Sequence, residues 1–160
     1  MTIASIEPKT IRVPMAGLKF GEPPDILETL LGSCVGIAVW DERSGNGGLA
    51  HVVLPDSQGK VAAPGTFVDT AVLELKNRLL ERGANPYSMR AKLAGGAIMF
   101  GKNTETVGTR NSKAALNNLD QQKIRVVAED LGGTKGRVIR FSLKDWSVEV
   151  EMARKIVAVI

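Results

Sequence analysis

Two side chains in this sequence could do covalent chemistry together. The chain holds one cysteine, Cys34, and one histidine, His51, and both lie in a single stretch, residues 30–55. A thiol beside an imidazole is the minimum machinery for a cysteine nucleophile, because the imidazole can accept the thiol proton and leave a thiolate. Taken singly, a lone cysteine is more often a small buried apolar residue. The chemistry therefore depends on whether the fold brings the two together.

The residues between Cys34 and His51 follow a pattern that predicts that the fold brings the two side chains together. Residues 35–40 and 49–54 are apolar, and the polar, glycine-rich residues 41–48 separate them. This pattern predicts two strands joined by a hairpin loop. An antiparallel hairpin folds the second strand back along the first. Cys34, at the start of one strand, is then expected near His51, at the end of the other.

The rest of the chain predicts an α+β fold. In residues 35–39, small and branched side chains alternate, so both faces of this strand are apolar and layers are expected above and below it. Helical spacing predicts a helix over residues 66–82, with a capping box formed by Thr66 and Asp69. A second, shorter helix is expected over residues 111–119. Strands dominate the remainder, which favours a layered α/β arrangement in which two or more helices cover a largely antiparallel central sheet.

Composition excludes several classes of protein. The 160 residues are enough for one domain, residues 1–160, and are 44% hydrophobic and 24% charged, as in ordinary soluble proteins. One cysteine excludes an internal disulfide and fits a cytoplasmic location. No metal site and no cofactor are expected, since cysteine and histidine are too few for a structural zinc site. We expect no membrane insertion and no signal peptide. The net charge of +4 comes from scattered basic residues, so no nucleic-acid binding is expected.

Ordered motifs in the sequence resemble the CheD family, the chemoreceptor glutamine deamidases of bacterial chemotaxis. LGSCV at residues 31–35 and GGLAHVVLP at residues 47–55 carry the first likeness. Further motifs follow in the family's order: PGTFVDTAV at 64–72, KLAGGAIMF at 92–100, VGTRN at 107–111 and AEDLGGTKGRVIRF at 128–141. Together they extend over roughly residues 11–150, and their order is more specific than any one motif alone.

The resemblance implies a fold similar to the catalytic domain of the cytotoxic necrotizing toxins. It also implies hydrolysis of specific glutamine side chains on the cytoplasmic helices of methyl-accepting chemoreceptors, and is linked to hydrolysis of receptor methyl esters. Cys34 would attack the carboxamide and His51 would move the protons. The backbone N–H of Cys34, with groups on Gly32 and Ser33, would stabilise the oxyanion. A CheC-type phosphatase is the further partner that the resemblance implies.

One position departs from the family's pattern. The pattern places a threonine six residues before the cysteine, where this chain has Glu28, and Thr29 follows it. Side chains at even separation in a strand share a face, so Glu28 is expected to point the same way as Cys34 and Thr29 the opposite way. Glu28 could then orient His51, as carboxylates do in other triads, and we favour this interpretation slightly. Thr29 could instead act through an irregular backbone, or Ser33 or a backbone carbonyl could replace the third member.

Two other functions remain open from the sequence. A cysteine hydrolase with this machinery could act on a different protein, as toxin deamidases do. A chain with a changed third residue could also keep a binding role, toward CheC-type phosphatases and receptors, without catalysis.

Overall fold

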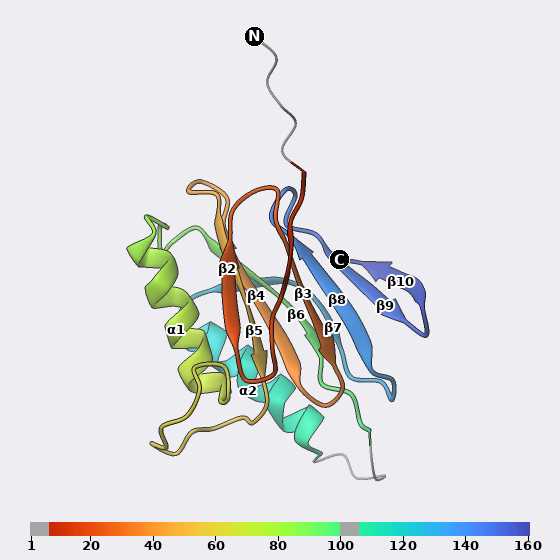
Figure 1. Ribbon diagram of the computed structural model, residues 1–160. Coiled ribbons are helices and arrows are strands. Elements are labelled where there is room, and N and C mark those ends of the chain that lie inside the picture. Colours follow the sequence, from red (N-terminus) through yellow and green to blue (C-terminus); the bar gives the residue numbers. More distant parts are fainter. Residues whose placement is uncertain (1–6, 100–105) are drawn as a thin grey trace.

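The computed structural model describes residues 7–99 and 106–160, and its strands form two five-stranded sheets that lie face to face (Figure 1). The outer sheet has the strand order β1 (Thr10–Arg12), β3 (Ile26–Leu31), β8 (Arg137–Ser142), β9 (Val148–Met152) and β10 (Lys155–Val159). The central sheet has the order β2 (Leu18–Gly21), β5 (Asn46–Val52), β4 (Val35–Asp41), β6 (Met89–Gly95) and β7 (Arg125–Leu131). Strand pairing is antiparallel except between β1 and β3 and between β6 and β7.

Two helices cover the face of the central sheet that the outer sheet leaves free. They are α1 (Val68–Glu81) and α2 (Val107–Gln121), and Figure 1 shows both on one side of the sheets. The α+β prediction is confirmed, and so is the expected layer on each side of the first hairpin strand. All seven residues of β4 are buried. Its central position explains why neither of its faces is polar.

Side chains of β4 alternate between two separate apolar layers. Val35, Ile37 and Val39 pack with the helices, whereas Ala38 and Trp40 pack against the outer sheet. The space between the two sheets is narrow beside this strand. A Cβ atom on Gly36 would come within 2.7 Å of Ile139 Cδ1 on β8. A glycine at this position therefore lets the outer sheet approach the strand that carries the candidate nucleophile.

Both predicted helices occur, but their first turns differ from the prediction. The capping box is wrong, because α1 follows Phe67 and has no side-chain cap. The Asp69 carboxylate instead accepts hydrogen bonds from the backbone N–H and the hydroxyl of Ser57, at 3.0 and 2.7 Å. The second helix begins earlier than predicted, at Val107, and Thr106 caps it by accepting a hydrogen bond from the N–H of Thr109. No described helix is long and apolar enough to cross a membrane.

The end of β6 generates a prediction about stability. Gly95 has a φ of 106°, and a Cβ atom there would collide with the carbonyl oxygen of Cys34. Gly83 has a φ of 94°, but nothing lies within 4 Å of the position of its Cβ atom. We expect Gly83→Ala to lower the free energy of unfolding by about 1 kcal/mol, from backbone strain alone. Gly95→Ala should lower it by about 3 kcal/mol, because strain and overpacking add. Urea unfolding measures both, and equal losses would contradict the collision.

Candidate active site

Backbone groups on both sides of β5 hold the backbone of His51 in place. The N–H of His51 donates to the carbonyl of Gly17 at 2.9 Å, and its own carbonyl accepts from the N–H of Ala16 at 3.0 Å. On the other side, His51 pairs with Gly36 of β4. Its imidazole points into the space between the sheets and is 4% exposed. The ring is thus presented by a rigid strand rather than by a loop.

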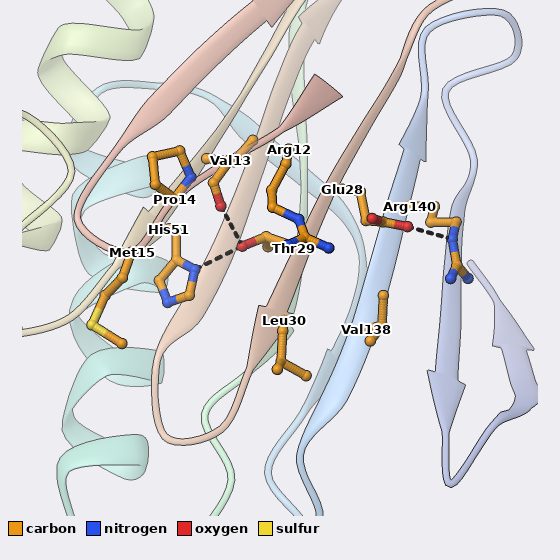
Figure 2. Close-up of a pocket in the computed structure, with 10 residues that line it drawn as sticks. All are labelled: Arg12, Val13, Pro14, Met15, Glu28, Thr29, Leu30, His51, Val138 and Arg140. Carbon is orange, nitrogen blue, oxygen red and sulfur yellow. Dashed lines mark hydrogen bonds and ion pairs between the residues drawn. The ribbon is translucent and has the colours of Figure 1, made fainter. Parts of the chain in front are cut away.

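Thr29 fixes the proton on this ring. Its Oγ1 lies 2.7 Å from Nδ1 of His51 and donates to the carbonyl oxygen of Val13 at 2.8 Å (Figure 2). A hydroxyl has a single hydrogen to donate. Because that hydrogen goes to Val13, the oxygen must accept from the histidine, and Nδ1 carries the ring proton. The neutral ring then has its lone pair on Nε2.

Nε2 of His51 is a buried base without a partner. It is buried and has no hydrogen-bond partner in the part of the chain that the structure describes. Burial also lowers the pKa of His51 below its ordinary value, because desolvation disfavours the imidazolium. The ring is therefore neutral at pH 7 and can accept a proton through Nε2.

Cys34 lies on the same face of the central sheet as this base. It directly precedes β4 and stands two residues before Gly36, which pairs with His51. It belongs to the apolar layer between the sheets and is 8% exposed. Burial raises the pKa of the Cys34 thiol, so the thiol keeps its proton until a base removes it. The thiol and the imidazole thus border the same layer between the sheets, and among the described residues no hydrogen bond joins the thiol to Nε2.

Hydrogen bonds to its carbonyl groups hold the turn that contains Cys34, residues 32–34. All three carbonyls of residues 32–34 accept hydrogen bonds, from the N–H of Ala97 at 3.0 Å, from Nδ2 of Asn111 at 3.2 Å and from the N–H of Gly96 at 2.8 Å. Among the described residues, the N–H groups of Ser33 and Cys34 donate no hydrogen bond. The described part of this turn is therefore anchored through its carbonyl groups and not through these two N–H groups.

Glu28 does not lie where the sequence predicted it. Along β3, Leu27 and Thr29 are buried toward the central sheet, whereas Glu28 is on the opposite face. Its carboxylate pairs with Nε of Arg140 on β8 at 2.8 Å, and Figure 2 shows it pointing away from His51. The expectation that Glu28 shares a face with Cys34 is therefore wrong. Alternation holds within one strand, but β3 ends at Leu31 and the chain then bends into the other sheet.

A cavity of about 410 Å³ borders His51 and Thr29 (Figure 2). Exposed apolar side chains stand beside it, since Met15 is 66% and Leu30 is 68% exposed. Its other lining residues come from β1 and the segment after it, from β3 and from β8: Arg12, Val13, Pro14, Glu28, Val138 and Arg140. The cavity lining thus combines apolar side chains, the imidazole and charged side chains from β1, β3 and β8.

Sequence reasoning missed two members of this site. The carbonyl of Val13 has no side-chain signal, so no pattern could have identified it. Asn111 did carry a signal, because it shares a buried helix face with Ala115 and Leu119, at helical spacing. An asparagine among such apolar positions indicates a buried polar contact.

Comparison with known proteins now decides the family. Residues 53–152 match the family model described as CheD chemotactic sensory transduction. A relative from Methanococcus maripaludis (strain C5), named "Probable chemoreceptor glutamine deamidase CheD", is 46% identical over 143 residues, which cover 88% of this chain and 93% of the relative. This chain belongs to the CheD family. CheD relatives with the same name occur in Clostridium novyi, at 41% identity over 88% of this chain and 91% of the relative, and in Oceanobacillus iheyensis, at 43% over 87% and 89%.

The single histidine makes its proton directly observable. In nitrogen NMR spectra of histidine-labelled protein, we expect Nδ1 protonated and Nε2 unprotonated, because the Thr29 hydroxyl accepts from Nδ1. Titration should give a midpoint below about pH 6.5, the ordinary value, because burial disfavours the imidazolium. Thr29→Val should mix the two tautomers, whereas Thr29→Ser keeps the hydroxyl and should preserve the wild-type spectrum. A wild-type spectrum with the proton on Nε2 would refute the assignment.

Proposed function

We propose that this CheD-family chain is a chemoreceptor glutamine deamidase, a hydrolase that converts the side-chain amide of specific receptor glutamines to a carboxylate. The observation that carries the proposal is the buried, unpartnered Nε2 of His51, on the face of the sheet that also carries Cys34. A buried polar atom without a partner costs stability, which favours a functional reason for it. The names of the CheD relatives support the substrate.

The first half of the reaction forms a thioester. Nε2 of His51 takes the thiol proton as Cys34 Sγ attacks the carbon of the glutamine carboxamide. The carbonyl π electrons move to oxygen, and the N–H groups of Ser33 and Cys34 are the donors that would bind this oxyanion. The carbon–nitrogen bond then breaks as His51 returns its proton to the nitrogen, and ammonia leaves.

The second half releases glutamate. His51, neutral again, removes a proton from a water molecule, which attacks the thioester carbon. The carbon–sulfur bond breaks, and the proton on His51 returns to Sγ of Cys34. Thr29 keeps the ring in one tautomer through both halves, since the same Nε2 must accept and donate each time. A glutamyl methyl ester can follow the same route with methanol as the leaving group, so methylesterase activity is part of the proposal.

The proposal includes a location and partners for this activity. We place the chain in the cytoplasm as one deamidase domain, residues 1–160, that acts on the cytoplasmic helices of methyl-accepting chemoreceptors. A CheC-type phosphatase is the proposed second partner, and nucleic acid is not a proposed partner. The alternative is a non-catalytic module that binds CheC-type phosphatases and receptors.

Ammonia release from a receptor cytoplasmic fragment separates these functions. The wild type should release ammonia, and mass spectrometry of the fragment should show glutamate in place of glutamine at specific sites. Cys34→Ala should lower the rate on the order of 10⁴-fold or more, because no other group can form the thioester. Circular dichroism should show that this variant is folded. A folded wild type that binds the fragment but releases no ammonia would leave the binding module as the better account.

A further inference from the structure

Asn111 joins the two segments that carry the candidate catalytic pair. It lies on α2, and its side chain is completely buried. Its Nδ2 donates to the carbonyl of Ser33 at 3.2 Å and to the carbonyl of Val53 at 2.9 Å. Ser33 directly precedes Cys34, and Val53 follows His51 by two residues. One amide group therefore contacts the backbone on both sides of the proposed proton transfer.

The two Asn111 hydrogen bonds join these segments beyond the end of the β4–β5 ladder. The ladder between β4 and β5 ends at the pair Val35 and Val52. Beyond it the chain after β5 turns away, and the N–H groups of Val53 and Leu54 both donate to the carbonyl of Thr66. The turn with Cys34 thus lies past the last ladder pair. The two hydrogens of one amide, one for each segment, continue the connection.

The Asn111 side chain also has a buried oxygen without a partner, which lowers stability and which helix packing does not require. Both neighbours of Nδ2 are carbonyl acceptors, which fixes the orientation of the amide group. Oδ1 is then buried, and in the described part of the chain it has no hydrogen-bond partner. Native structures contain few such atoms, and they are expected at functional or strained sites. Helix packing by itself would favour an apolar residue here, as at Ala115 and Leu119.

We propose that Asn111 is a positioning residue that sets the separation between the Cys34 thiol and Nε2 of His51. This inference rests on the proposed cysteine–histidine chemistry and adds a residue to it. The other two hydrogen bonds to the described turn, from the N–H groups of Gly96 and Ala97, come from the segment after β6 and not from β5. Loss of the amide therefore frees the thiol relative to the imidazole while the rest of the turn stays held.

The expected consequence is a loss of turnover rather than of binding. Asn111→Ala should lower kcat by on the order of 10²-fold, since small displacements of reacting groups have effects of this size. KM should change little, because Asn111 is buried and does not line the cavity beside His51. Leu119→Val is the matched control, since it removes buried volume from the same helix without touching the turn. Asn118→Ala is a second control, because its amide bonds to the helix carbonyl of Ala114.

Thiol alkylation tests the inference without any receptor. The rate of Cys34 alkylation by iodoacetamide is compared with and without His51→Asn, first in the wild-type background and then with Asn111→Ala. We expect His51→Asn to slow alkylation at least about tenfold in the wild type, because the imidazole generates the thiolate. With Asn111→Ala the same change should have little effect, whereas with Leu119→Val it should keep its full effect. If Asn111→Ala does not fold, Asn111→Asp, which has nearly the same size but offers at most one donor, replaces it.

Each outcome decides a different question. The positioning role would be overturned if His51→Asn slowed Cys34 alkylation as much with Asn111→Ala as in the wild type. It would also be overturned if Asn111→Ala and Leu119→Val lost the same kcat. Either result would leave the deamidase proposal intact. Alkylation that is independent of His51 in the wild type would overturn both. A third outcome separates the two proposals. If the alkylation rate depends on His51 and Asn111→Ala abolishes this dependence, but the protein releases no ammonia from receptors, the positioning role is supported and the proposed substrate is refuted.

Discussion

The hydrogen bond between Thr29 and His51 joins the two sheets at the point where the chemistry is proposed. Thr29 belongs to the outer sheet and His51 to the central sheet, and the bond between them is 2.7 Å long. It has a defined direction because the hydroxyl hydrogen is already donated to Val13. The protonation of the ring therefore depends on how the sheets pack, and anything that separates them would release the base. Gly36, opposite His51, is where the sheets approach closely enough for this contact.

The candidate nucleophile depends on a second set of contacts, made mostly by backbone groups. The glycine-rich residues 130–136 bond to the end of β6 and to the segment after it: the Gly132 N–H donates to the Gly95 carbonyl, and the Ile98 N–H donates to the Gly133 carbonyl. Arg137 is buried and donates to carbonyls of these same residues. The segment after β6 then donates to the turn that carries Cys34. The thiol is held indirectly by a loop whose glycines could have suggested a ligand site.

The sequence predicted the features that rest on local patterns. Alternating apolar residues located the β4–β5 hairpin, which pairs His51 with Gly36, two residues after Cys34. The two-sheet arrangement was not predictable in this way, because consecutive strands β3 and β4 belong to different sheets. The same change of sheet explains why Glu28 was favoured over Thr29 as the partner of His51. Alternation was counted from Cys34 back to Glu28 across the end of β3, where it does not hold. Strand β10 has no alternation of apolar and polar residues that would predict it from the sequence, and most of its residues are exposed.

The most direct test of the account compares Thr29 with Glu28 as the residue that orients His51. The measurement is kcat/KM for deamidation of a receptor cytoplasmic fragment by Thr29→Val, Thr29→Ser and Glu28→Gln. We expect a loss of about 10²-fold or more for Thr29→Val, the range of acid–base contributions to catalysis. Thr29→Ser and Glu28→Gln should remain near the wild type, because the first keeps the hydroxyl and the second changes a group paired with Arg140. Full activity in Thr29→Val, or an equal loss in Glu28→Gln, would show that Thr29 is not the residue that orients His51.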